Sequence, residues 1–265
     1  MSKIRVGDIR PSQFMYTYGI GSIIDLPAFS VIVSGLDDWK INPDTVTPIF
    51  EDRLLKAVQY YEPQTKSLIS PPLKPDDYNF GDPFDERSTV GLPVRVFPSW
   101  MVCPKCHLLA PIETGLFELK KNFYRVENNR FVHTGCTKKG PSGKAPQVVP
   151  ARFLAACEDG HLDDFPWSEY VHQGQPCTAP ILKFNEFGMS GEARGVIVEC
   201  MNCGSKRPLS EAFRKEKRDK LPLCAGSRPH LRDTDPKKCE YHIRPIVLGA
   251  SNSWFSVIQS VIAIP

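Results

Sequence analysis

Hydrophobic and polar positions alternate in short runs along the first hundred residues, and none of these runs is long. The run SVIVSGLDDW (residues 30–39) is rich in β-branched residues and predicts a strand. The apolar spacing within FEDRLLKAVQYY (50–61) predicts a short helix. Aromatic and β-branched residues with two glycines in RPSQFMYTYGIGSIIDLP (10–27) predict an extended segment with a turn. A proline-rich stretch, 62–93, then predicts a connector.

The rest of the chain shows the same alternation of short strands and turns. One strand is expected in VRVFPSW (94–100), and a strand pair turning at Asn128-Asn129 in LFELKKNFYRVENNRFVH (116–133). VVPARFLAAC (148–157) predicts a buried strand. An exposed helix is expected over 210–220, with Ser210 as its N-cap. Short elements therefore dominate the prediction.

Composition narrows the class of protein. The 265 residues include 25 prolines, nearly twice the usual share of about 5%, so long helices should not dominate. No stretch of about 18 apolar residues occurs, which argues against a membrane span. The N-terminus, MSKIRVGDIRPSQF, lacks the apolar core of a signal peptide. We therefore expect a cytoplasmic protein, whose thiols stay reduced.

The cysteines are distributed unevenly. All nine follow residue 100, and two pairs have the spacing Cys-x-x-Cys. In a reducing compartment such pairs indicate metal ligands, and zinc is the metal that four thiolates suit. The sequence predicts two structural zinc sites. The second site is expected to consist of Cys200, Cys203, Cys224 and Cys239.

The first zinc site is less determined by spacing. Cys103 and Cys106 need two further ligands, and Cys136 and Cys157 are favoured because each follows an apolar run. The other candidates in the sequence are His107, His133, His161 and Cys177. In a rival arrangement, Cys157, His161, His172 and Cys177 form a site of their own. Under the favoured assignment Cys177 is spare, and removing it should leave two zinc ions per chain.

These elements predict a mixed α+β fold of irregular architecture, with short strands and helices and two structural zinc-knuckle modules. The expected domains are an N-terminal α/β region (1–93), a first zinc-binding module (94–192) and a second zinc-binding module (193–265). The apolar ending SVIAIP would normally be packed inside something, which suggests that the chain continues into a further C-terminal region.

The segment CEDGHLDDFPWSEYVH (157–172) has the composition of an active site. His161, Asp163, Asp164 and His172 could bind a catalytic metal, which makes a metal-dependent nuclease the alternative function. A structural interpretation is favoured instead. Either aspartate could cap a short helix that begins near Pro166, and His161 could orient a zinc ligand.

Other enzyme motifs are missing. The string GPSGKA (140–145) lacks the spacing of a phosphate-binding loop, and there is no H-x-E with P-C-x-x-C, no H-E-x-x-H and no G-x-S-x-G. No catalytic residue is assigned, and the chain is expected not to be an enzyme.

Charge indicates where nucleic acid could bind. Residues 204–239 carry 11 basic and 5 acidic groups, although the whole chain has a formal charge of +3. Thiolate ligands would offset this basicity, since two four-thiolate zinc sites bring the charge to about −1. The candidate nucleic-acid contacts are Lys138, Lys139, Arg214, Lys215 and Arg218. A solvated helix with internal ion pairs explains residues 210–220 equally well.

Several segments together resemble a known family. RPSQFMYTYGIGSIIDLP, VRVFPSWMVCPKC, PARFLAACEDGHLDDFPWSEYVH and CAGSRPHL are similar to the N-terminal half of DrmB, the helicase-associated subunit of the bacterial DISARM anti-phage system. The resemblance implies a non-catalytic partner of a large helicase-like ATPase, DrmA, that helps it engage DNA. It also implies a second Cys-x-x-Cys-like pair near residue 136, where this chain has only Cys136.

Overall fold

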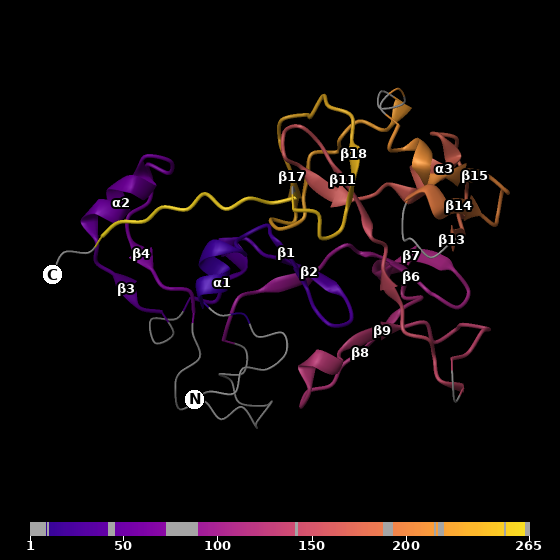
Figure 1. Ribbon diagram of the computed structural model, residues 1–265, viewed down its shortest axis with the longest axis horizontal. Coiled ribbons are helices and arrows are strands. Elements are labelled where there is room, and N and C mark those ends of the chain that lie inside the picture. The colour runs from indigo at the N-terminus through magenta and orange to yellow at the C-terminus, as the bar shows by residue number, and fades with distance from the viewer. Residues whose placement is uncertain are drawn as a thin grey trace.

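The computed structural model describes residues 9, 11–41, 46–72, 90–140, 143–187, 193–214, 216, 220–251 and 253–262, and every structural statement below concerns these residues. Short strands predominate and helices are few, which confirms the expected mixed character (Figure 1). The α-helices are α1 (Pro11–Tyr16), α2 (Asp52–Gln59) and α3 (Trp167–His172). No described helix is long and apolar enough to cross a membrane.

The N-terminal region is built on a three-stranded antiparallel sheet. Its order is β1-β2-β5, with β1 at Ile23–Asp25, β2 at Ser30–Val33 and β5 at Val94–Val96. All four residues of β2 are buried, because this strand lies between the other two and its side chains enter the core. The predicted strand and the predicted short helix, α2, are both present.

One expectation for the N-terminal region was wrong. The segment 10–27 begins with helix α1 and only later becomes extended. The N–H groups of Thr17 and Tyr18 both donate to the carbonyl of Gln13, at 2.8 Å. Phe14 and Tyr18, four positions apart, pack against buried residues of the sheet, so burial favours a helical turn here over the extended form.

The central element is a six-stranded antiparallel sheet of order β10-β6-β7-β13-β14-β15. Its strands are β6 (Trp100–Val102), β7 (Leu108–Pro111), β10 (Val149–Pro150), β13 (Leu182–Glu186), β14 (Val196–Cys200) and β15 (Lys206–Pro208). The largest core cluster includes the aromatic side chains of Phe153, Phe165, Trp167, Tyr170 and Phe184. The pairing of β13 with β14 crosses the expected boundary between the two modules, and that division stays a prediction.

A smaller three-stranded sheet joins distant parts of the chain. Strand β11 (Phe153–Ala156) lies in its middle, between β12 (Leu162–Asp164) and β18 (Arg244–Val247). This confirms the buried strand predicted before Cys157. The two-stranded sheets pair β3 (Pro48–Ile49) with β4 (Leu68–Ile69), β8 (Glu118–Lys120) with β9 (Arg130–Val132), and β16 (Ser227–Arg228) with β17 (Asp233–Thr234).

Short 3-10 helices complete the described elements: η1 (Leu36–Asp38), η4 (Ile112–Thr114), η5 (Val126–Asn128), η7 (Ala193–Gly195) and η8 (Leu209–Glu211). The last one corrects the exposed helix expected over 210–220. Its N-cap is Pro208, and Ser210 lies inside it. Leu209 and Ala212 are buried three positions apart, and this anchoring suits one tight turn.

The N-terminal region contacts the end of the chain. Gly35 N–H donates to the carbonyl of His230 at 2.8 Å, and Arg232 forms an ion pair with Asp38 at 2.6 Å. The segment after β18 then runs towards α2, in yellow in Figure 1. Along it, the Trp254 indole Nε1 donates to the carbonyl of Ile20 at 3.0 Å. Residues from the two ends of the sequence therefore share one structural unit.

Candidate metal centres

Three groups of possible metal ligands occur in the described residues. They are cluster 1 (Cys103, Cys106, His133, Cys136), cluster 2 (Cys157, His161, Cys224, Cys239) and cluster 3 (His172, Cys177, Cys200, Cys203). Each cluster contains three cysteines and one histidine, and its ligand atoms all lie within 4.8 Å of one another. All nine cysteines of the chain are used, so none is spare.

This grouping differs from the expected pairing of the cysteines into two sets. Cys103, Cys106 and Cys136 do lie together, but Cys157 joins Cys224 and Cys239 instead. The reason is the sheet around β11, which places the end of that strand beside the chain near β18. Cys200 and Cys203 are grouped with Cys177. The four residues of the rival site, Cys157, His161, His172 and Cys177, do not lie together, since they are divided between clusters 2 and 3.

Cluster 1 is built on a tight turn between two sheet strands. Cys103 directly follows β6; its N–H donates to the carbonyl of Leu108 at 2.9 Å, and its own carbonyl accepts from His107 N–H at 2.8 Å. His107 has a φ of 63°, which the turn requires and which a non-glycine residue adopts at some cost. The other half follows β9, where a turn places His133 and Cys136 on the same side. Both halves are therefore anchored by strands.

Cluster 3 repeats the same turn on the edge of the six-stranded sheet. Cys200 N–H donates to Ser205 and the Cys200 carbonyl accepts from Gly204, both at 2.8 Å. Gly204 has a φ of 76° and occupies the position that His107 has in cluster 1. The remaining ligands come from the end of α3 and from the loop after it. Two Cys-x-x-Cys pairs thus form one kind of turn, each completed from elsewhere in the chain.

The histidine of cluster 3 carries an observation that points to a metal. His172 is buried, and its Nδ1 lies 2.6 Å from the carbonyl of Ser168. A carbonyl can only accept, so Nδ1 holds the proton and Nε2 presents its lone pair. That Nε2 is buried, and no hydrogen-bond partner for it is found in the described part of the chain. A bound cation would satisfy it, and the carbonyl of Ser168 would orient the ring, as in many metal-bound histidines.

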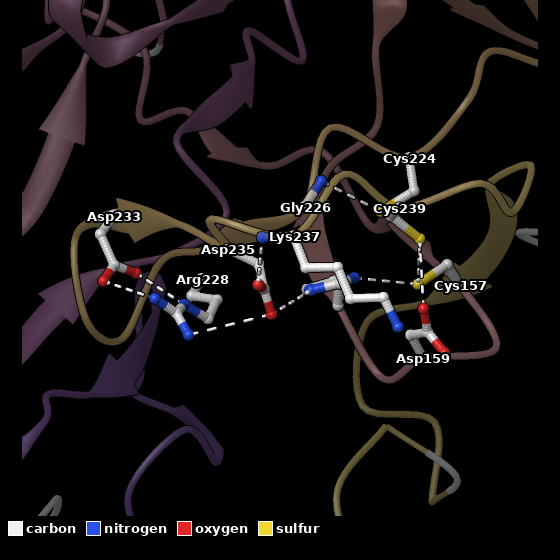
Figure 2. Close-up of polar contacts among 10 residues, drawn as sticks. Cys157, Asp159, Cys224, Gly226, Arg228, Asp233, Asp235, Lys237 and Cys239 are labelled. Carbon is white, nitrogen blue, oxygen red and sulfur yellow. Dashed lines mark hydrogen bonds and ion pairs between the residues drawn. The ribbon is translucent and has the colours of Figure 1, made fainter.

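Cluster 2 differs because its first two ligands lie in the hairpin between β11 and β12. Cys157 Sγ lies 3.4 Å from His161 Nδ1, and Cys157 N–H donates to the His161 carbonyl at 3.1 Å. The other nitrogen, His161 Nε2, lies 3.4 Å from Asp235 Oδ2. Figure 2 shows Asp235 between this site and Arg228, to which it is connected by a 3.9 Å ion pair. A carboxylate in this place orients the imidazole and makes it a stronger ligand.

The separations between ligand atoms fit a tetrahedral metal. Zn–S bonds of about 2.3 Å place two sulfurs about 3.8 Å apart, and a Zn–N bond of about 2.1 Å places sulfur and nitrogen about 3.6 Å apart. The Sγ–Sγ distances are 3.9 Å for Cys103–Cys136, 3.8 Å for Cys157–Cys239 and 4.0 Å for Cys177–Cys200. A disulfide needs about 2.05 Å, and all nine cysteines are free. The three clusters are therefore compatible with zinc.

The acidity of the thiols also fits a cation. Burial raises the pKa of the Cys106 thiol to about 11 and that of the Cys224 thiol to about 12, so a positive charge is needed to hold them as thiolates near neutral pH. Burial also opposes ionisation of Cys200, but the N–H groups of Cys203 and Asn202 hold its pKa at about 6.

The residues of the alternative nuclease site do not form one site. His161 and His172 belong to different clusters. Asp164 instead accepts hydrogen bonds from the N–H and hydroxyl of Ser99, at 3.0 and 2.7 Å, and so ties β12 to the start of β6. Asp163 accepts from Asp164 N–H at 2.8 Å. Neither aspartate caps α3, whose N-cap residue is Pro166 and has no side-chain hydrogen bond. A cavity of about 80 Å³ lies beside His161 and these two aspartates.

The expected nucleic-acid contacts are only partly described. Lys138 and Lys139 are exposed after cluster 1, and Lys139 Nζ donates to the carbonyl of Thr134 at 3.0 Å. Arg214 is exposed just after η8. Lys215 and Arg218 lie outside the described residues. The three described side chains are thus available to solvent, in two separate places.

The spacing of the histidines relative to the cysteines accounts for the ligands that the sequence left undetermined. His133 and Cys136 have the spacing of a Cys-x-x-Cys pair with one histidine substituted, which is the second pair that the resemblance implied. Cys157 and His161 form a similar pair with one more residue between them. A search for cysteine pairs alone misses both, whereas a search that also allows histidine finds them.

Comparisons with known proteins identify the family of the chain. The model of a family described as a domain of unknown function (DUF8724) matches residues 10–255. The chain is also similar to DISARM protein DrmB of Bacillus paralicheniformis, with 32% identity over 182 residues, which confirms the resemblance to DrmB. The match covers 66% of this chain and 29% of that protein, so the chain spans less than a third of its relative's length. Because the family model covers nearly all of the chain, the protein belongs to the DUF8724 family.

Proposed function

We propose that this chain acts in DISARM anti-phage defence as a non-catalytic zinc-binding subunit, which associates with a helicase-like ATPase of the DrmA type and helps it engage DNA. The observation that carries the proposal is the ligand arrangement of the three clusters. Each supplies four protein ligands. Four such ligands complete a tetrahedral zinc site and leave no position for water or substrate, which is typical of a structural site rather than a catalytic one.

The metal ligands in this proposal are the nine cysteines together with His133, His161 and His172. Each three-thiolate, one-histidine site with Zn²⁺ carries a charge of −1, so three of them offset the formal charge of +3 to about zero. A nearly neutral chain gains little from long-range attraction to DNA. This favours a subunit that contributes local contacts within a complex over a free-standing DNA-binding protein.

Co-purification with a DrmA-type ATPase tests the partner. The zinc-loaded protein and the ATPase are expected to elute together at moderate salt, and the pair is expected to bind DNA more tightly than the ATPase alone. Independent elution would refute the association. Incubating the purified protein with DNA and Mg²⁺ or Mn²⁺ tests the alternative enzyme class. Cleavage that an Asp164→Ala variant abolishes would overturn the non-catalytic assignment.

A further inference from the structure

A broad recess lies beside η8. Its volume is about 680 Å³, and the described residues that line it are Ala193, Arg194, Ser210, Phe213 and Arg214. An aromatic side chain therefore lies between two arginines in one concave surface. None of these residues is a candidate metal ligand.

The aromatic ring in this recess is held in place and remains accessible. Phe213 is 39% exposed, although it packs edge-on against the buried Phe153, with ring centroids 5.9 Å apart and planes at 72°. An edge-on contact leaves one face of the ring free for another flat group. Exposed aromatic rings in a charged recess are the usual platforms on which unpaired bases stack.

The two arginines supply positive charge to the recess. Arg194 and Arg214 are both exposed, and within the described part of the chain neither guanidinium forms an ion pair. The residue after Arg194, Gly195, lies close to Phe187: its carbonyl accepts from Phe187 N–H at 2.7 Å, and a Cβ on Gly195 would come within 2.2 Å of the Phe187 carbonyl oxygen. Two guanidinium groups beside an exposed aromatic ring can bind phosphates while a base stacks on the ring. A single strand of nucleic acid offers both groups in alternation.

The recess is supported by the core that carries cluster 3. Leu209 is fully buried, and the hydroxyl of Tyr170 donates to the carbonyl of Pro208 at 2.7 Å. Arg207 lies 4.2 Å from the ring centre of Tyr170 and donates to its carbonyl at 3.0 Å. Tyr170 is in α3, the helix that ends with the ligand His172. A metal bound in cluster 3 would therefore stabilise α3, the helix against which η8 packs.

We infer that this recess is a binding site for single-stranded DNA, in which Phe213 stacks on a base and Arg194 and Arg214 contact phosphates. The inference rests on the proposed role in DNA engagement, and it specifies where the DNA binds and that the bound DNA is single-stranded. A duplex would not use the ring, because its bases are already stacked on one another. Duplex DNA is therefore expected to bind more weakly here than a single strand.

The test uses zinc-loaded protein, alone and with its ATPase partner, and a fluorescent oligodeoxythymidine as the probe. Phe213→Leu keeps an apolar side chain against Phe153 but removes the stacking face, and it should weaken binding by about 5- to 150-fold. Phe213→Tyr keeps both and should bind like wild type. Arg194→Gln with Arg214→Gln should lower the slope of log K against log salt by about 1.4, at about 0.7 for each phosphate contact.

Matched controls separate this site from general charge. Lys56→Gln with Lys66→Gln removes the same charge near α2, at the opposite end of the molecule in Figure 1, and should leave the salt slope unchanged. Equal binding by wild type and Phe213→Leu would overturn the site while leaving the proposed function intact. No DNA binding by the wild-type complex would overturn both. Tighter binding of oligouridine, or equal competition by polyglutamate, would overturn the assignment to DNA.

Discussion

A variant of Cys177 can distinguish the ligand grouping in the structure from the pairing expected from the spacing of the cysteines. Its Sγ lies 4.0 Å from Cys200 Sγ, within cluster 3. If all three clusters hold zinc, Cys177→Ser should lower the content from three ions per chain to two. Under the spacing-based pairing Cys177 is spare, and two ions should remain in both proteins.

The size of the effect follows from the number of ligands. A structural zinc site in a small domain contributes about 10–16 kcal/mol, so each of four ligands contributes about 2.5–4 kcal/mol if they share it evenly. Loss of one ligand then weakens binding by about two to three orders of magnitude, since 1.4 kcal/mol corresponds to tenfold. A chelator of intermediate affinity should therefore remove the ion from cluster 3 of the variant and leave the wild type loaded.

Elemental analysis after dialysis against such a chelator measures the content. A second pair of variants tests the histidine ligands: His133→Asn should lose one ion, whereas His107→Asn should lose none. His107 lies beside cluster 1 without being a ligand, and asparagine tolerates its positive φ of 63°. Two ions in both wild type and Cys177→Ser, or full content in His133→Asn, would refute the grouping.

Two further predictions concern carboxylates near the clusters. Asp235→Asn should weaken zinc binding at cluster 2 by about 10- to 100-fold in a competition assay, because it removes the negative charge beside His161 Nε2. The control variant Asp233→Asn loses an ion pair with Arg228 and should leave zinc binding unchanged. Burial raises the pKa of Asp164 to about 6, although hydrogen bonds from Ser99 and Trp100 act in the opposite direction. The native state then keeps a proton that the unfolded state releases at lower pH, so this group lowers stability as pH rises through about 4 to 6. In urea unfolding from about pH 5 to pH 7, the stability of wild type relative to Asp164→Asn should fall by about 1 kcal/mol, and a constant difference would contradict the assignment.

Local patterns in the sequence predict many of the elements but not their partners. The strand at Ser30–Val33, the helix α2, the strand pair β8 and β9 and the buried strand β11 all follow from spacing and residue type. Each Cys-x-x-Cys turn also brings its own two cysteines together, Cys103 with Cys106 and Cys200 with Cys203. The spacing cannot show which distant segment supplies the other two ligands of each cluster, because that depends on the order of the strands in the sheets.

The two errors about helices have a common physical cause. The helix expected over 210–220 is replaced at its start by the 3-10 turn η8, because Leu209 and Ala212 anchor this part of the chain in the core. The segment 11–16 is helical where an extended form was expected, because Phe14 and Tyr18 pack on one side. In both cases tertiary contacts overrode local preference.

The contact between Trp254 and Ile20 affects how the chain is made. These residues are 234 positions apart, and the indole of Trp254 also lies against Gly19. A ribosome adds about 5–20 residues per second, so Ile20 waits about 10–50 s before its partner is synthesised. Arg232, which pairs with Asp38, is also made late. During this interval the first sheet emerges without the residues that will cover it, and chaperones have a defined segment of a nascent chain to shield.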